Sequence, residues 1–278
     1  MLKTVYATGL TGFIGSHLLT SLLAEYDLIL NFRRNNTIDI HAKGQATVSK
    51  NISLDVLEEY PSNTLFHLAT NYNPYPKSEK HISSVVDSNF TFPMKLIIKL
   101  NPDPNKFTLI TTSSYMQLID KEYQNIYSLS KDMFLNWYQG NFNNLINLYL
   151  FDSFGVNDSR NKIVDNFIKK ILKEEEIIIP KNNIEINLLK VDTIIAQIIR
   201  GSRMSNGNYL IASNKTISIN SLALLLMDIM QKRTRVTKKG TSTNYLDYFS
   251  SKYTNLIDSE SENSLDKDLE DHVIQLIK

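Results

Sequence analysis

Three glycines near the start of the chain constrain its fold more than any other feature. They lie between an apolar segment, residues 2–6, and an amphipathic segment, residues 16–25. This order predicts a strand, a glycine turn and a helix, the βα unit that binds a dinucleotide pyrophosphate at the helix N-terminus. The spacing is one residue longer than the commonest fingerprint, and an ordinary glycine turn is the alternative. The cofactor-binding residues predicted here are Gly9, Thr11, Gly12, Phe13, Ile14 and Gly15.

Composition narrows the class of protein. The chain has 278 residues, of which 42% are hydrophobic, enough for a large core and a smaller second lobe. The net charge of +1 predicts no nucleic-acid or membrane partner. The absence of cysteine excludes disulfides and thiolate ligands and is compatible with a reducing compartment. With no room for a signal peptide and no membrane-length apolar stretch, we expect a cytoplasmic protein.

Apolar runs alternate with helical patterns through the first half of the chain. The candidate strands are residues 4–8, 28–32, 65–69, 107–112 and 145–151, and the candidate helices are residues 16–25, 85–100 and 127–140. This order predicts an α/β fold with a Rossmann-type, doubly wound parallel sheet. We expect residues 1–156 to form the NAD(P)-binding domain with the catalytic residues. Residues 157–278 are expected to form a smaller C-terminal α/β substrate lobe, which can interleave with the first domain.

The end of the second strand bears on cofactor choice. A fold that selects NAD usually ends this strand with a carboxylate that binds the ribose 2′-hydroxyl. Here the strand ends in Asn31-Phe32-Arg33-Arg34, without an acid. Because guanidinium groups pair with phosphate, Arg33 and Arg34 favour NADP(H) over NAD(H). The alternative is that they only solvate a strand end.

A tyrosine and a lysine four residues apart form the second motif. On a helix, Tyr127 and Lys131 would share a face, so the lysine could stabilise the tyrosine phenolate for acid–base chemistry at a ketone. The same spacing recurs at Tyr248 and Lys252, in a segment of little periodicity. Only the first pair follows a strand that ends in hydroxyl residues. A packed tyrosine and a solvated lysine remain the alternative.

Taken together, these motifs resemble the NAD-dependent epimerase/dehydratase family of extended short-chain dehydrogenases/reductases, over nearly the whole chain. The matching segments are residues 8–15, 66–70, Asn89, residues 111–112 and the Tyr127/Lys131 pair. The resemblance implies that Thr112, Tyr127 and Lys131 are catalytic. Tyr127 would protonate a ketone oxygen, Lys131 would lower its pKa and hold the nicotinamide ribose, and Thr112 would orient the substrate oxygen.

The resemblance also implies the surroundings of this trio. Leu68, Ala69 and Thr70 would line the adenine-ribose side of the cofactor, and Asn89 would support the active-site backbone. Substrate contacts are expected from Tyr72, Ser113 and Asp152. His67 is expected to be structural rather than a ligand, and no metal is predicted. Five cations are candidates for holding a substrate diphosphate, with surface solvation as the alternative: Arg160, Lys162, Lys190, Arg200 and Arg203.

Within the family, the chain looks most similar to synthases of CDP-abequose or CDP-paratose type. These enzymes reduce a nucleotide-linked 4-keto-6-deoxyhexose for surface-polysaccharide synthesis, and we expect the same of this chain with NADPH. Ser113 and Ser114 stand where dehydratases have an acidic pair. Two alternatives stay open: a nucleotide-sugar 4-epimerase with tightly bound NAD, and a non-catalytic NADP-binding sensor or scaffold. As in related enzymes, the helices at 85–100 and 127–140 predict a homodimer, with Phe134, Leu135 and Trp137 available for the interface.

Overall fold

A nine-stranded, mostly parallel sheet forms the centre of the computed structural model, which describes residues 2–120, 122, 124–257 and 264–277. The strand order is β15-β12-β7-β6-β5-β1-β2-β3-β4. The bounds are β1 Thr4–Thr8, β2 Leu28–Phe32, β3 Thr37–Ala42, β4 Val48–Asn51, β5 Thr64–His67, β6 Thr108–Ser114, β7 Asn144–Leu150, β12 Gly207–Ile211 and β15 Thr254–Asn255. The strands from β15 to β2 pair in parallel. The predicted Rossmann-type α/β fold is confirmed.

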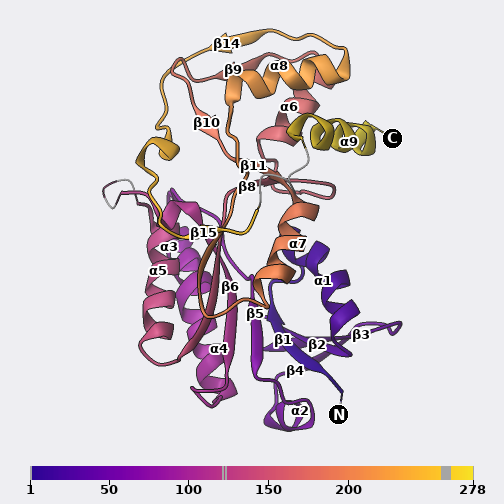
Figure 1. Ribbon diagram of the computed structural model, residues 1–278, viewed down its shortest axis with the longest axis vertical. Helices are drawn as coiled ribbons and strands as arrows, with labels where there is room; N and C mark the ends of the chain where they lie inside the picture. Colours follow the sequence, from indigo (N-terminus) through magenta and orange to yellow (C-terminus); the bar gives the residue numbers. More distant parts are fainter. Residues whose placement is uncertain (1, 121, 123, 258–263, 278) are drawn as a thin grey trace.

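Helices cover both faces of this sheet (Figure 1). Helices α1 (Phe13–Glu25) and α7 (Val191–Gly201) lie on one face, and α3 (Glu79–Val86), α4 (Phe92–Leu100) and α5 (Ile126–Gln139) lie on the other. Side chains alternate between the faces along each strand. On β1, Val5 and Ala7 therefore join the core with α1 and α7, whereas Tyr6 joins the core with α4 and α5.

The edge at β3 and β4 was not predicted. Strands β2 and β3 are antiparallel, as are β3 and β4. Asn36 makes the reversal with a φ of 60°, in the left-handed region that asparagine tolerates. The Arg33 amide donates to the Thr37 carbonyl at 2.9 Å. The chain therefore returns along β2 as a hairpin, and helix α2 (Leu54–Glu59) follows β4.

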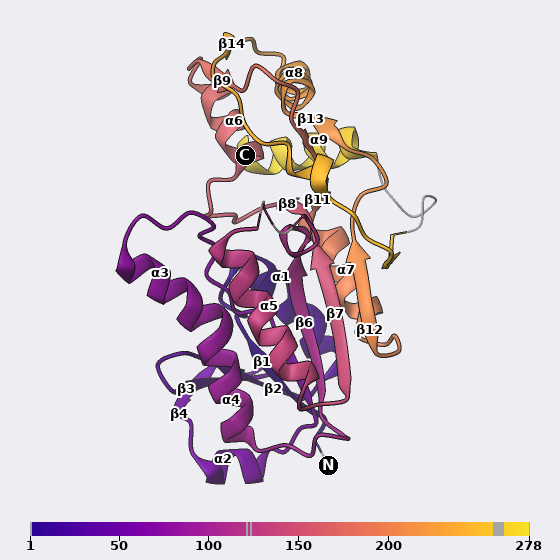
Figure 2. The same cartoon turned by 90° about the vertical axis from the view of Figure 1, so that its left-hand side faces the viewer.

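A smaller lobe lies beyond the carboxyl ends of the central strands (Figures 1 and 2). It contains α6 Ile163–Leu172, α8 Ile219–Met230, α9 Leu265–Ile277, β9 Ile177–Ile179, β10 Glu185–Ile186, β13 Ile217–Ser218 and β14 Val236–Lys238. The short parallel pair β8 (Asp152–Phe154) and β11 (Leu188–Lys190) lies where the two bodies meet. Helix α7 and strands β12 and β15 come after residue 157, yet they belong to the central sheet and its helices. Residues beyond the predicted boundary therefore contribute both to the sheet domain and to the smaller lobe. The boundary itself stays a prediction.

The helix predicted at residues 85–100 is built from three parts. A π-helical turn, η1 (Asp87–Thr91), interrupts it between α3 and α4. On α5, Phe134 and Leu135 are buried in the core rather than available for an interface. The exposed large apolar residues of α3, α4 and α5 are Ile82, Ile98, Leu129 and Met133. The homodimer stays a prediction. These four exposed residues, rather than Phe134 and Leu135, are the ones that such an interface could use.

Candidate active site

The glycine turn after β1 brings bare backbone to the N-terminus of α1. Gly9 has a φ of 79°, and a Cβ there would lie 2.5 Å from the backbone nitrogen of Ala69. A Cβ at Gly15 would lie 2.1 Å from the Gly9 carbonyl oxygen. The Gly12 amide donates to the same carbonyl at 3.0 Å, and Gly12 precedes the first residue of α1. Close backbone approach and a helix N-terminus are the features that fit a pyrophosphate.

A cavity of about 1160 Å³ opens beside this turn. This volume exceeds the range of an ordinary single-ligand pocket, so a dinucleotide and a second ligand can share it. The predicted site residues that line the cavity are Gly9, Thr11, Gly12, Phe13, Ile14, Gly15, Arg33, Arg34, Leu68, Ala69, Thr70, Tyr72, Thr112, Ser113, Tyr127, Lys131 and Asp152. The fold thus brings together segments from five strands and their following loops.

The end of the cavity next to β2, where the adenosine of the cofactor is expected and which is called the adenosine end below, carries both predicted arginines, and one unexpected acid lies nearby. Arg33 and Arg34 line the cavity together with Asn31. Asp39, on β3, lies beside them, and its carboxylate is 3.0 Å from Nη1 of Arg33. The sequence of β2 contains no acid at this end, but the antiparallel hairpin brings one from the neighbouring strand.

Tyr127 and Lys131 lie on the first two turns of α5, which begins at Ile126. Asn125 caps this helix, and its side chain accepts a hydrogen bond from the Ser128 amide at 3.1 Å. Both side chains are buried, with 6% exposure for Tyr127 and 7% for Lys131. The Lys131 ammonium is 5.8 Å from the centre of the Tyr127 ring. The predicted shared face is therefore present at the cavity wall.

Burial dominates the ionisation of this pair. It raises the pKa of Tyr127 to about 12, although hydrogen bonds with Thr70 and Ser114 and the charge of Arg160 oppose the rise. The phenol is thus protonated at neutral pH, the form that can donate a proton. The lowering of this pKa by Lys131 stays a prediction, because the effects that oppose burial here come from Thr70, Ser114 and Arg160. Burial also lowers the pKa of Lys131 to about 8, and the charge of Asp132 only partly offsets this.

The lowered pKa of Lys131 predicts a loss of activity in mild alkali. As pH rises through about 8, Lys131 loses its proton and with it the charge beside Tyr127. For the acid–base role predicted for this pair, we expect kcat/KM, which reports ionisations of the free enzyme, to fall through this range. Lys131→Arg keeps a charge at all these pH values and is expected to flatten the profile at a lower plateau. A wild-type profile that stays flat to pH 10 would contradict this account.

Hydroxyl groups from the end of β6 and the loop after β5 face the phenol. Residues two apart on a strand share a face, so Thr112 and Ser114 lie on the same side of β6. The hydroxyls of Ser114 and Thr70 lie near enough to Tyr127 to lower its pKa against the effect of burial. Ser113 also lines the cavity, but its hydroxyl donates to the side chain of Asn147 at 2.6 Å. Ser114 is a site residue that the motif comparison did not assign, because the resemblance points to Thr112.

Asn89 organises the loop that carries Thr70 and Tyr72. It lies in the π-helical turn η1, and its Oδ1 accepts hydrogen bonds from Thr70 Oγ1 at 3.0 Å and from the Asn71 amide at 2.8 Å. Its Nδ2 donates to Ser130 Oγ at 3.1 Å. Asn89 thereby ties this loop to α5. Of the predicted cofactor-binding residues, it is the one outside the lining of the cavity, and its contacts are those of a support for the backbone.

His67 behaves as the structural residue that was expected. Its Nδ1 is 2.7 Å from Thr8 Oγ1, between β1 and β5. Burial and the nearby charge of Lys131 lower its pKa to about 3, so the ring is neutral.

The end of the cavity where a substrate is expected is lined by a small group of charged and aromatic residues. The Tyr72 ring lies 5.0 Å from the Tyr127 ring, and the Lys162 ammonium lies 3.8 Å from the Tyr72 ring centre. Burial raises the pKa of Asp152, while the charges of Lys162 and Arg160 oppose the rise. Of the five cations that were candidates for holding a diphosphate, Lys162 and Arg160 line the cavity.

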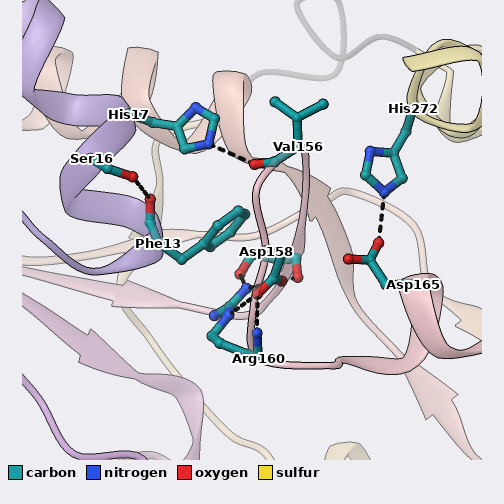
Figure 3. A network of polar contacts seen from close by, with 9 residues as sticks. Phe13, Ser16, His17, Val156, Asp158, Arg160, Asp165 and His272 are labelled. Carbon is teal, nitrogen blue, oxygen red and sulfur yellow. Dashed lines mark hydrogen bonds and ion pairs between the residues drawn. The ribbon is translucent and has the colours of Figure 1, made fainter. Parts of the chain in front are cut away.

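Arg160 is held in place by its own loop, as Figure 3 shows. Its Nε and Nη2 each donate to the Asp158 carboxylate at 2.7 Å, and its guanidinium lies 4.1 Å from the Phe13 ring centre. His17, on α1, is 3.0 Å from the Val156 carbonyl. This loop thus lies against the start of α1, next to the glycine turn.

The remaining candidates lie elsewhere. Lys190 is within 4.0 Å of three aspartates, Arg200 donates to the Leu256 carbonyl, and Arg203 pairs with Glu25. Tyr248 and Lys252, the second pair with the same spacing, are not among the described residues that line the cavity.

A protein-family model decides the classification. The model of the NAD dependent epimerase/dehydratase family matches residues 5–186, which include the glycine turn, Tyr127 and Lys131. The chain belongs to this family. It is accordingly an enzyme of the extended short-chain dehydrogenase/reductase type.

Individual proteins are also similar to this chain. CDP-abequose synthase of Yersinia pseudotuberculosis is 28% identical over 77% of each chain. The UDP-glucuronic acid 4-epimerase of Bacillus cereus, solved with UDP-glucuronic acid and NAD, has a TM-score of 0.74 at 17% identity, over 98% of this chain and 99% of that one. RMD from Pseudomonas aeruginosa, solved with NADPH, has a TM-score of 0.69 at 16% identity over 98% of each chain. The structural matches show the shared fold, and they include complexes with either cofactor.

In the part that the structure describes, no group of three or more His, Cys, Asp and Glu side chains is placed to hold a metal ion. None of the described helices has the length and apolar character needed to cross a bilayer.

Proposed function

We propose that this protein reduces the keto group of a nucleotide-linked 4-keto-6-deoxyhexose, with NADPH as the reductant. The observation that carries the proposal is the buried, protonated phenol of Tyr127, which lies in the same cavity as the glycine turn and beside the hydroxyls of Ser114 and Thr70. A ketone reduction needs an acid at this place. The similarity to a protein named CDP-abequose synthase supports the choice of a nucleotide-linked sugar.

The residues of the chain supply binding, orientation and the proton. The glycine turn and the N-terminus of α1 hold the pyrophosphate of the cofactor. NADPH, when bound, supplies a hydride to the keto carbon. Tyr127 donates its proton to the keto oxygen as negative charge develops there, and Ser114 and Thr112 hydrogen-bond to that oxygen. Lys131 stabilises the phenolate that is left.

The end of β6 supports reduction over elimination of water. Elimination needs an acid and a base at the sugar ring, whereas the residues after Thr112 are two serines. Ser113 donates a hydrogen bond to Asn147, and the hydroxyl of Ser114 lies near Tyr127. Neither hydroxyl can serve as a strong base at neutral pH.

Lys162 is suited to attract the anionic part of the substrate. Among the described cations of the cavity, Arg160 has its carboxylate partner in Asp158, while Lys162 contacts an aromatic face and lies near Asp152. We therefore include Lys162 in the substrate site with Tyr72 and Asp152. A diphosphate bound there would compensate the charge of a lysine that burial disfavours.

The paired variant Arg33→Ala with Arg34→Ala tests the cofactor. Both guanidinium groups line the adenosine end of the cavity, where they can pair with a 2′-phosphate. We expect the preference for NADPH over NADH, measured as a ratio of dissociation constants, to fall by about 10- to 100-fold, with NADH binding nearly unchanged. An unchanged ratio would remove these arginines from cofactor selection.

The reaction is tested by absorbance at the reduced-nicotinamide band. The purified protein is mixed with NADPH and with each member of a panel of nucleotide-linked 4-keto-6-deoxyhexoses. Oxidation of NADPH with one member supports the proposal and identifies the sugar. Copurified NAD together with interconversion of a sugar at carbon 4, without net oxidation, would replace it with the epimerase.

A further inference from the structure

Three polar side chains form a row across the antiparallel edge of the sheet. In the register of β2, β3 and β4, Asn31 lies opposite Asp39, and Asp39 lies opposite Ser49. Residues directly opposite each other on antiparallel strands project to the same face. The hairpin that the sequence did not reveal therefore aligns an amide, a carboxylate and a hydroxyl behind the adenosine end of the cavity.

Asp39 is the centre of this row. Its Oδ2 accepts hydrogen bonds from Nη1 of Arg33 at 3.0 Å and from Nδ2 of Asn31 at 3.4 Å, and its Oδ1 accepts one from Ser49 Oγ at 2.8 Å. Only 6% of the residue is exposed. Burial alone raises the pKa of Asp39, but the hydrogen bonds from Ser49 and Arg33 and the charge of Arg33 outweigh it, so the pKa lies below its usual range. The carboxylate is ionised at neutral pH.

The position of Asp39 separates it from the ribose-binding acids of NAD-selective folds. Asn31, Arg33 and Arg34 line the cavity, whereas Asp39 is not among the described lining residues. Both of its oxygens already accept hydrogen bonds from protein groups. The same row also reaches the glycine turn, because Asn31 Oδ1 accepts a hydrogen bond from the Leu10 amide at 3.3 Å.

Arg33 keeps donors for a ligand despite this contact. A guanidinium has five N–H donors in a fixed fork, and the contact with Asp39 involves Nη1. The Arg33 side chain is 44% exposed and lines the cavity. Without a partner, a long side chain at this exposure would lose considerable rotamer freedom when it binds a phosphate. Because Asp39 restricts the Arg33 side chain before the nucleotide arrives, less of this freedom is lost on binding, and binding is favoured.

We propose that Asp39 is a positioning residue for cofactor selection: it holds the Arg33 guanidinium at the adenosine end of the cavity and so favours a nucleotide with a 2′-phosphate, without touching the nucleotide. The inference rests on the proposed use of NADPH. It makes β3 and β4, which carry Asp39 and Ser49, part of the specificity of the enzyme. An acid that bound the ribose of NAD directly would have the opposite effect on cofactor preference, because it would repel the 2′-phosphate of NADP.

Binding titrations of the full chain with NADP⁺ and NAD⁺ test the inference without a sugar substrate. For Asp39→Asn, we expect the dissociation constant of NADP⁺ to rise about tenfold and that of NAD⁺ to change little. Ser49→Ala, which removes one hydrogen bond to Asp39, is expected to shift the ratio in the same direction by less. Asp228→Asn is the matched control, because it breaks an exposed ion pair with Arg233 in the smaller lobe.

A double variant separates positioning from general damage to the fold. If Asp39 acts through Arg33, Asp39→Asn should not change the NADP⁺/NAD⁺ ratio further in an Arg33→Ala background. Equal weakening of both nucleotides, an unchanged ratio, or tighter NADP⁺ binding in Asp39→Asn would each overturn the inference. A wild-type protein that binds NAD⁺ more tightly would overturn the proposed cofactor as well. If the wild-type protein prefers NADP⁺ and Asp39→Asn leaves the NADP⁺/NAD⁺ ratio unchanged, only the role of Asp39 is overturned.

Discussion

Tyr127→Phe is expected to lower kcat by about two to four orders of magnitude, the usual contribution of a general acid. The substitution removes one oxygen and leaves the ring, which packs 5.0 Å from the Tyr72 ring. NADPH binding should therefore change little, because the glycine turn and the adenosine end of the cavity are untouched. Steady-state kinetics with the reducible sugar, together with a cofactor titration, measure both effects.

Tyr248→Phe is the matched control for this variant. Tyr248 has the same spacing to a lysine, at Lys252, but does not line the cavity in the described part of the chain. It should retain wild-type turnover. Near-normal turnover of Tyr127→Phe would remove Tyr127 from the proton transfer and leave the proposed mechanism without its acid.

Gly15→Ala is expected to weaken both the fold and cofactor binding. Gly15 lies inside α1, where helix propensity by itself favours alanine by about 1 kcal/mol. The added Cβ would nevertheless lie 2.1 Å from the Gly9 carbonyl oxygen and 2.6 Å from the Leu10 Cα, both backbone atoms. Because the turn must move, we expect a loss of about 1–3 kcal/mol in the free energy of unfolding. NADPH affinity should fall by about 10- to 100-fold, since the same backbone forms the pyrophosphate site.

Gly140→Ala provides the comparison for this prediction. Gly140 follows α5 with a helical backbone, and a Cβ there would meet its nearest neighbour at 3.5 Å, an ordinary contact. Denaturant unfolding and NADPH titration should show this variant close to wild type. If Gly15→Ala binds NADPH as tightly as Gly140→Ala does, the close approach at the glycine turn is not needed for the cofactor.

The parts of the site that the sequence predicted are those with a local pattern. The glycine turn needs only the order of strand, glycines and helix, and β1 and β2 have the predicted bounds. Tyr127 and Lys131 are four residues apart on one helix, and the structure places both at the cavity wall. The resemblance to the family also identified residues of the loop after β5, and these line the cavity.

The parts that were missed depend on contacts between segments. A turn signal existed at Asn35-Asn36, ahead of the alternating residues of β3, and could have predicted the hairpin. Nothing local, however, tells that Asp39 pairs with Arg33, because that contact follows from strand register. Ser114 was missed for a related reason. The motif points to Thr112, and only the meeting of β6 with the first turn of α5 brings the Ser114 hydroxyl to Tyr127.

The π-helical turn η1 shows another limit of periodicity. A single helix was predicted over residues 85–100, since the apolar pattern continues through it. The turn at Asp87–Thr91 inserts a wider hydrogen-bonding pattern, which is frequent at functional sites. It places Asn89 where its side chain binds the loop that contains Thr70 and Asn71.

The most direct test of the central claim follows a labelled hydride. NADPH that carries deuterium on the transferable position of its nicotinamide carbon 4 is incubated with the protein and the sugar that the absorbance assay identifies. The account predicts one NADPH oxidised for each sugar reduced, and deuterium bound to carbon 4 of the product, as seen by mass spectrometry and NMR. Conversion of the sugar with no deuterium incorporated and no NADPH consumed would contradict it.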